Sequence, residues 1–231
     1  MIFEQLFDQK SSTYTYIIAS GEGREALIID PVIEHSDEYS TILKNLDLKL
    51  VKVIDTHIHA DHISALNELN KRTNCIRVMG EKSKSEVIDL RIKDGEKINV
   101  EEVELQAIYT PGHTDCSYSF LMNDRVFTGD TLLINGSGRT DFQNGNAYDA
   151  YDSIFNKLLK LPGKTLVFPA HDYNGKKFST IENEKNNNPR LQVSSKEEYA
   201  DIMNNLNLAN PKMMDVAVPA NVKGLTLDNI N

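Results

Sequence analysis

The sequence of 231 residues has little of several features that mark whole classes of protein. It contains two cysteines, Cys75 and Cys116, and no tryptophan. Two thiols do not build a disulfide framework, so we expect a reducing, cytoplasmic location. No apolar run approaches the roughly 20 residues of a membrane-spanning helix, so no membrane contact is expected. Residues 1–10 have no basic stretch before an apolar segment, which argues against a signal peptide.

Positive charge is also scarce in this sequence. Lysine and arginine number 25 against 34 acidic residues, which gives a formal net charge of −9. Nucleic-acid-binding proteins usually present a basic face, so nucleic acid is not an expected partner. Hydrophobic residues make up 40% and charged residues 26%, as in ordinary globular proteins. We expect a single domain over 1–231, with a core over about 1–175 and a helical appendage and tail over about 176–231.

Strand-forming runs occur in two separate parts of the chain. β-branched and aromatic runs predict strands over 14–18, 26–29, 50–54, 103–108, 118–122, 125–128 and 165–168. Helical spacing of apolar residues predicts helices over 36–46, 63–71 and 147–159, the first capped by Ser36, and mostly helical structure after 175 that finishes in an extended tail. Two strand-rich halves, each followed by helices, predict an α/β fold layered as helix, sheet, sheet and helix (αββα).

Histidines gather where predicted strands end. Five of the six follow a predicted strand directly: His57, His59, His62, His113 and His171. Asp61 and Asp130 occupy the same kind of position. Strand ends are where a rigid scaffold presents functional groups. Imidazole and carboxylate are the usual ligands of zinc and of non-haem iron.

One segment carries this signal most strongly. His57, His59, Asp61 and His62 place four ligand-type side chains within six residues. Burying them together without a metal would leave polar groups unsatisfied, so the segment predicts a metal site. His35 has no such companions, and we interpret it as a structural residue.

The motifs around these residues resemble those of a known superfamily. They are Thr56-His57-Ile58-His59-Ala60-Asp61-His62, Gly112-His113-Thr114, Thr128-Gly129-Asp130 and Ala170-His171. In this order they resemble the metallo-β-lactamase superfamily over about residues 10 to 175. The αββα sandwich of that superfamily agrees with the predicted layers.

The resemblance leaves two kinds of enzyme open. One is a two-metal hydrolase of the glyoxalase II type, which splits a glutathione thioester and in which Asp130 would bridge two zinc ions. The other is persulfide dioxygenase, which oxidises glutathione persulfide with O₂ and water to sulfite and glutathione. The segments 127–145, 169–175, 188–191 and 204–221 resemble the second family. The roughly sixty residues after the last motif also leave little room for the larger helical domain expected of glyoxalase II.

For a persulfide dioxygenase, the resemblance implies one Fe(II) per chain, held by His57, His113 and Asp130. Two imidazoles and one carboxylate on one face leave positions for O₂, the persulfide sulfur and water. A metal-binding or scaffold protein without enzymatic activity is a third class, and it would require Asp130, His113 and the pair of arginines, Arg139 and Arg190, to be fortuitous.

The resemblance also assigns roles around the metal. His59, Asp61, His62 and His171 would orient the ligands and hydrogen-bond water. Tyr173 would donate its hydroxyl near the metal.

Substrate recognition is expected to depend on local positive charge, because the substrate and the protein are both anionic. The resemblance maps contacts to glutathione persulfide onto Arg139, Tyr173 and Arg190, and Thr114, beside His113, is a further candidate for binding the substrate. Arginine forks suit carboxylates. Cys116 is either a small packed residue or a redox group, and Cys75 is interpreted as structural.

The sequence departs from the persulfide dioxygenase pattern at two places. Asn135 stands where arginine is common, which would remove a cation near the site and weaken substrate binding. The usual cysteine after the Pro219-Ala220-Asn221 motif is missing. Glutathione persulfide and O₂ are the expected partners, and we also consider a homodimer.

Overall fold

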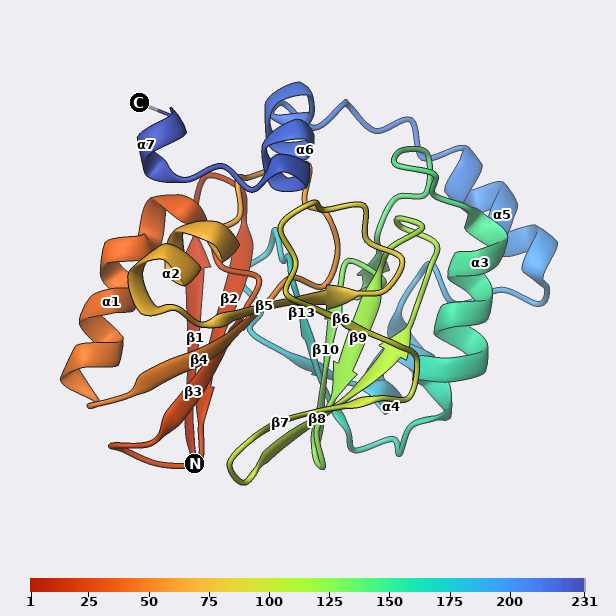
Figure 1. Ribbon diagram of the computed structural model, residues 1–231. Coiled ribbons are helices and arrows are strands. Elements are labelled where there is room, and N and C mark those ends of the chain that lie inside the picture. The colour runs from red at the N-terminus through yellow and green to blue at the C-terminus, as the bar shows by residue number, and fades with distance from the viewer. Residues whose placement is uncertain (231) are drawn as a thin grey trace.

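Two six-stranded β-sheets face each other at the centre of the molecule (Figure 1). The computed structural model describes residues 1–230. The first sheet has the order β1 (Ile2–Asp8), β2 (Thr13–Ala19), β3 (Glu25–Ile29), β4 (Lys49–Ile54), β5 (Ile76–Gly80), β6 (Leu90–Ile92). The second has the order β14 (Ser179–Thr180), β13 (Leu166–Pro169), β10 (Arg125–Gly129), β9 (Tyr118–Leu121), β8 (Val103–Tyr109), β7 (Lys97–Val100).

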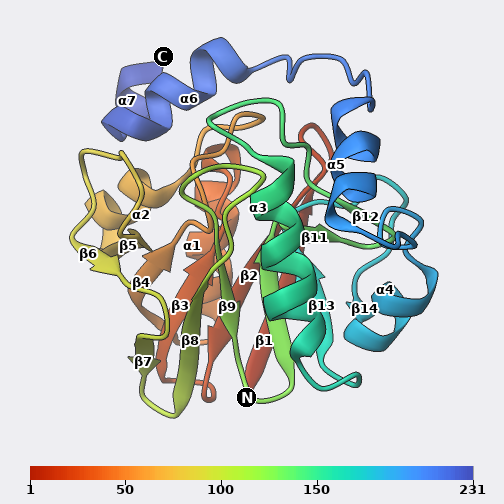
Figure 2. The same ribbon diagram turned by 90° about the vertical axis from the view of Figure 1, so that its right-hand side faces the viewer.

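Helices cover the outer faces of both sheets. A 3₁₀ turn η1 (Ile33–His35), α1 (Ser36–Asn45) and α2 (Leu66–Thr73) lie beside the first sheet. The second sheet is covered by α3 (Ala147–Tyr151), its continuations η2 (Asp152–Lys157) and η3 (Leu158–Lys160), α4 (Ile181–Asn187) and α5 (Lys196–Asn204), as Figure 2 shows. The predicted αββα architecture is confirmed. In the part of the chain that the structure describes, no helix is long and apolar enough to cross a membrane.

Three apolar clusters hold the layers together. The central one lies between the sheets and includes Tyr16, Leu27, Phe120 and Phe127, all at most 1% exposed. The two outer clusters join each sheet to its helices. Burial of this much apolar surface on both faces of each sheet is the main stabilising contribution to the fold.

All seven predicted strands are present, but several further strands were not predicted. β1 alternates poorly because Glu4 and Gln5 interrupt its apolar residues, while β5, β6 and β7 are short and carry charged residues. The small hairpin of β11 (Leu132–Leu133) and β12 (Gly136–Ser137) was also missed.

The predicted helices differ from the structure in detail. Ser36 is not the N-cap of α1, because η1 precedes it and its hydroxyl donates to the carbonyl oxygen of Ile33 at 2.6 Å. The helix expected over 147–159 is helical throughout, but its second part has π-type turns. The extended tail is wrong for residues 227–230, which form α7 (Leu227–Ile230), and residue 231 lies outside the described residues.

The strand ends that carry the motifs meet at one end of the molecule. β3 and β4 run parallel, as do β10 and β13, so their carboxyl ends point the same way. The two sheets are joined there, since the Tyr14 N–H donates to the Ala170 carbonyl at 2.7 Å. α6 (Met214–Lys223) lies across this end, at the top of Figure 1.

Candidate metal centre

The ligand-type side chains converge from the ends of four strands. His57, His59, Asp61 and His62 follow β4, His113 lies between β8 and β9, Asp130 follows β10, and His171 follows β13. Gly129, with φ of 52°, allows the close approach of two of these ends. A Cβ at this position would lie 2.7 Å from the Thr56 hydroxyl oxygen.

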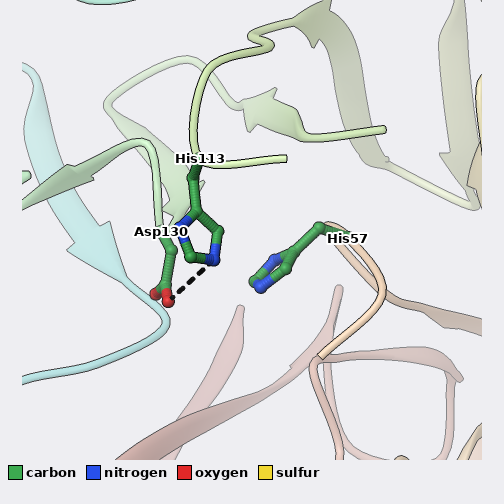
Figure 3. A group of neighbouring side chains, drawn as sticks. All are labelled: His57, His113 and Asp130. Atoms are coloured by element: carbon green, nitrogen blue, oxygen red, sulfur yellow. Dashed lines mark ion pairs between the residues drawn. The ribbon is translucent and has the colours of Figure 1, made fainter. Parts of the chain in front are cut away.

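His57, His113 and Asp130 form one donor set (Figure 3). One ligand atom from each lies within 4.8 Å of the others. His113 Nε2 is 3.6 Å from Asp130 Oδ2, and the two imidazole rings are nearly perpendicular, with centroids 4.9 Å apart. Two imidazoles and one carboxylate facing a common centre are a suitable set for a transition metal.

The hydrogen bonds of His113 present its lone pair to this centre. Its Nδ1 is 2.7 Å from the carbonyl oxygen of Arg139, which can only accept. Nδ1 therefore carries a hydrogen, and Nε2 is the ring nitrogen that faces Asp130 and the centre.

Two successive hydrogen bonds orient His57 in the same way, with its Nε2 toward the centre. The Thr56 hydroxyl donates to Asp30 Oδ2 at 3.0 Å, so its oxygen accepts from His57 Nδ1 at 3.0 Å. Nε2 of His57 then carries the lone pair. Burial, with the neighbouring His59 and His113, holds the pKa of His57 well below its usual range, so the ring is neutral and able to bind a metal.

Asp130 is ionised and shared between the centre and His171. Burial by itself would raise the pKa of Asp130, but the ion pair and hydrogen bond with His171 hold it well below its usual range. His171 Nδ1 donates to Asp130 Oδ1 at 2.6 Å, which leaves Oδ2 facing His113.

His59, Asp61 and His62 form a second donor set beside the first. His59 Nε2 donates to Asp30 Oδ1 at 3.1 Å, and His62 Nδ1 lies 2.9 Å from Asp61 Oδ2. Although burial disfavours the charged ring, the Asp30 carboxylate raises the pKa of His59 to about 9. The remaining nitrogens, His59 Nδ1 and His62 Nε2, are buried without a hydrogen-bond partner among residues 1–230. Buried unpaired nitrogens beside carboxylates fit a site that holds a metal.

A pocket of about 440 Å³ opens onto the first donor set. It is lined by Ala60, Asp61, His113, Asp130, Arg139, His171, Tyr173, Arg190, Leu208, Ala209 and Pro211. This volume lies in the range of small-molecule sites.

Arg190 brings positive charge into the pocket without a carboxylate partner among the described residues. Its Nη1 donates to the carbonyl oxygen of Ser137. The remaining guanidinium hydrogens are available to an anion, and burial lowers the pKa of Arg190.

Arg139 also lines the pocket, but most of its donors are occupied. Nε and Nη2 each lie 2.7 Å from an oxygen of Asp141. Nη1 and Nη2 also donate to the carbonyl oxygens of Ala209 and Leu208. Arg139 therefore holds the segment that forms one pocket wall.

Tyr173 lines the pocket, whereas Thr114 does not. The Tyr173 ring is 72% exposed and stacks parallel to His171 at the pocket, with centroids 6.2 Å apart. Thr114 is fully buried and away from the pocket lining, and its hydroxyl lies 2.7 Å from the Ser117 hydroxyl. In this structure Thr114 therefore supports the loop that carries His113 rather than the substrate that it was expected to bind.

Asn135, the two cysteines and His35 lie outside the pocket lining. Asn135 is exposed in the turn between β11 and β12 with φ of 57° and does not line the pocket, so its effect on substrate binding stays a prediction. Cys75 and Cys116 are buried free thiols, and burial raises the pKa of each, which fits packed residues rather than a redox pair. His35 is structural, since it pairs with Asp8 and Glu38.

Thr13 and Asn221 contact the site but were not predicted. The Thr13 hydroxyl lies among Asp61, His62 and His171. The Asn221 amide binds the carbonyl oxygens of His59 and His62. The Pro219-Ala220-Asn221 motif could have pointed to Asn221. Nothing in the sequence around Thr13 marked Thr13 as part of the site.

Known proteins share this architecture and sequence. A family model described as the metallo-beta-lactamase superfamily matches residues 9–89 and 80–171. The protein named persulfide dioxygenase ETHE1, mitochondrial, from Mus musculus is 43% identical over 226 residues, covering 96% of this chain and 88% of that protein. The chain belongs to the metallo-β-lactamase superfamily and, within it, to the persulfide dioxygenase family.

Structural similarity to the persulfide dioxygenase family is equally extensive. The crystal structure of ETHE1 from Myxococcus xanthus matches with a TM-score of 0.94 and 49% identity, covering 96% of this chain and 98% of that one. The hydroxyacylglutathione hydrolase of Dictyostelium discoideum is more distant, at 29% identity over 75% of this chain and 68% of that protein. Membership of the family, together with the His and Asp donor sets, makes this end of the persulfide dioxygenase fold a metal-binding centre.

Proposed function

We propose that this protein is an iron-dependent persulfide dioxygenase that acts on glutathione persulfide. The reaction converts glutathione persulfide, O₂ and water into glutathione, sulfite and two protons, which balances atoms and charge. The sulfur–sulfur bond breaks, the terminal sulfur is oxidised, and O₂ accepts the electrons. Family membership supports this class of reaction.

The observation that carries the assignment of one iron is the geometry of His57, His113 and Asp130. Each imidazole has its Nδ1 hydrogen engaged by another group and its Nε2 free for the centre. Asp130 has Oδ1 bonded to His171, which leaves Oδ2 for the centre. A facial set of two imidazoles and one carboxylate is typical of non-haem Fe(II) oxygenases. When bound there, Fe(II) supplies the redox chemistry toward O₂ and a position for the persulfide sulfur.

The residues of the pocket give the substrate its place. Arg190 presents a guanidinium that fits a carboxylate of the glutathione moiety. Arg139 fixes the wall formed by Leu208 and Ala209, which limits the space beside the centre. Tyr173 offers its hydroxyl at the exposed side of the pocket.

His171 holds a proton next to the centre. Its Nδ1 faces Asp130 and its Nε2 faces Asp61, so both ring nitrogens carry hydrogens. The two carboxylates together raise the pKa of His171 well above its usual range, although burial opposes this. His171 thereby neutralises part of the negative charge around an anionic substrate.

A two-metal glutathione thioesterase of the glyoxalase II type is the alternative. The unpaired nitrogens of His59 and His62 are the observation in its favour, because they offer donors beside the first set.

Metal analysis separates the two candidates. Protein purified without oxygen is expected to contain one iron per chain and to consume O₂ when glutathione persulfide is added, with sulfite formed in equal amount. The His57→Ala variant is the control, since it removes a ligand and should lose both iron and O₂ uptake. Two zinc ions per chain, with hydrolysis of S-lactoylglutathione and no O₂ uptake on persulfide, would contradict the proposal.

The cellular setting and assembly are also proposals. The free thiols Cys75 and Cys116 support a reducing compartment such as the cytoplasm. Cell fractionation tests this location, and light scattering of the purified protein tests the homodimer.

A further inference from the structure

We propose that the hydroxyl of Thr13 keeps the metal centre mononuclear. This inference rests on the single-iron dioxygenase proposed above and names the residue that separates it from a two-metal hydrolase. The second donor set lies close enough to the first to complete a second metal site, since the rings of His57 and His59 have centroids 4.2 Å apart.

Backbone contacts hold Thr13 in place next to the side chains of the metal centre. It is the first residue of β2, is fully buried, and forms a backbone bridge with His171. The next residue, Tyr14, bonds to the carbonyl of Ala170. The Thr13 side chain therefore sits at the junction of the two sheets, where the strand ends that carry the ligands meet.

Four polar groups surround the Thr13 hydroxyl oxygen. They are Ser11 Oγ at 2.7 Å, His171 Nε2 at 3.0 Å, Asp61 Oδ2 at 3.1 Å and His62 Nδ1 at 3.4 Å. Three of the four belong to the ligand-type residues predicted from the sequence. These three side chains thus contact one neutral hydroxyl.

The hydrogens in this cluster leave few lone pairs for a cation. Asp61 Oδ2 accepts from His171 Nε2 at 2.9 Å, and His62 Nδ1 and Thr13 Oγ1 also lie beside the same oxygen. His171 uses both of its nitrogens as donors. In the second set, the buried ligand atoms without a hydrogen-bond partner among the described residues are one nitrogen of His59 and one nitrogen of His62. Catalytic zinc sites use three protein ligands.

Thr13 differs from the histidines in how it responds to a metal. Metal binding releases protons from imidazoles, so ring hydrogens by themselves do not exclude a cation. A threonine hydroxyl does not ionise under such conditions, and its oxygen stays in place beside both Asp61 and His171. Removing that hydroxyl should free the Asp61 carboxylate and the His171 ring to bind a second ion.

The test is a metal count on wild type, Thr13→Val and Thr13→Ser, each dialysed against buffered Zn²⁺ alone. Wild type and Thr13→Ser, which keeps a hydroxyl, should retain one equivalent. Thr13→Val, which has the same shape without the hydroxyl, should retain two, and a second equivalent of Co²⁺ should add to its visible absorption. Structural damage would lower the count, so a gain is specific to the proposed role.

The outcomes separate this inference from the proposed function. One equivalent in both wild type and Thr13→Val overturns the role of Thr13 and leaves the dioxygenase intact. Two equivalents in wild type, with thioester hydrolysis, overturn the dioxygenase as well. If Thr13→Val does not fold, Thr13→Ala carries the same expectation, because water can fill the space and satisfy the neighbouring groups.

Discussion

The side-chain amide of Asn221 donates to the carbonyl oxygen of His62 at 3.0 Å. The same amide donates to the carbonyl of His59 at 2.9 Å, and its oxygen accepts from the Ser64 N–H at 2.8 Å. Asn221 is part of α6, so this helix fixes the loop after β4 where it carries His59, Asp61 and His62.

Replacing Asn221 by alanine should loosen this loop and weaken metal binding. Three hydrogen bonds are lost and buried carbonyls are left unpaired, so we expect a loss of about 2–4 kcal/mol in the free energy of unfolding. Urea unfolding measures this loss, and chelator competition measures the metal affinity. Val216→Ala on the same helix is the matched control, since Val216 is 56% exposed. Equal metal affinity in both variants would argue against a role for Asn221.

Gly138 is expected to tolerate no side chain. A Cβ there would lie 2.0 Å from the Asp130 carbonyl oxygen and 3.0 Å from His113 Cγ. Gly138→Ala should therefore displace two of the three ligands and reduce bound iron at least ~10-fold, as misplaced ligands commonly do. Gly136→Ala is the control, because its Cβ would make only an ordinary contact, 3.8 Å from Leu133. Similar iron content in the two variants would contradict this reasoning.

Arg190→Ala should raise the KM for glutathione persulfide at least ~10-fold with a smaller change in kcat, because a hydrogen bond to a charged group contributes about 1.5–3 kcal/mol. Steady-state O₂ uptake gives both constants. Arg190→Lys should recover part of the loss, since it restores charge without the fork. Arg24→Ala, at a surface ion pair with Glu102, serves as the control. An unchanged KM in Arg190→Ala would remove the substrate assignment.

The pair of His35 and Asp8 should make stability depend on pH. Although burial disfavours the charged ring, hydrogen bonds to Asp8 and Glu38 raise the pKa of His35, and the pKa of Asp8 is lowered. The contribution of His35 to the free energy of unfolding is complete below the pKa of histidine in the unfolded chain, about 6.5. It is lost as pH rises through the higher pKa of His35 in the folded protein.

The loss of stability caused by His35→Gln should therefore become smaller as pH rises. We expect the variant to be less stable than wild type by about 1 kcal/mol at pH 6 and by less at pH 9. Urea unfolding at the two pH values measures the difference. Glu38→Gln is the comparison, because Glu38 is the more exposed partner of His35. A pH-independent difference would show that the ion pair contributes nothing.

The parts of the site that could be predicted are those whose residues lie close together in the sequence, in short motifs. His57, His59, Asp61 and His62 lie within six residues, so their proximity required no knowledge of the fold. Strands such as β2 and β4 were equally visible, because they are rich in β-branched and aromatic residues, such as Tyr16 and Ile17 in β2 and Val53 in β4.

The parts that could not be predicted depend on contacts between distant segments. Thr13 meets Asp61 across 48 positions and His171 across 158. Asn221 meets His59 across 162. A single threonine at the start of a strand or a single asparagine in a helix carries no local pattern, so its role becomes visible only when the sheets are packed. The occupied donors of Arg139 and the burial of Thr114 were hidden for the same reason.

The contacts of α6 have a consequence for the order of events during synthesis. All ligand-type residues of both donor sets are translated before residues 214–223. A nascent chain therefore has its complete set of ligands while the loop after β4 still lacks its anchor in Asn221. Stable loading with iron should follow the emergence of α6 from the ribosome, and ribosome-bound chains arrested before residue 214 should exchange metal faster than the finished protein.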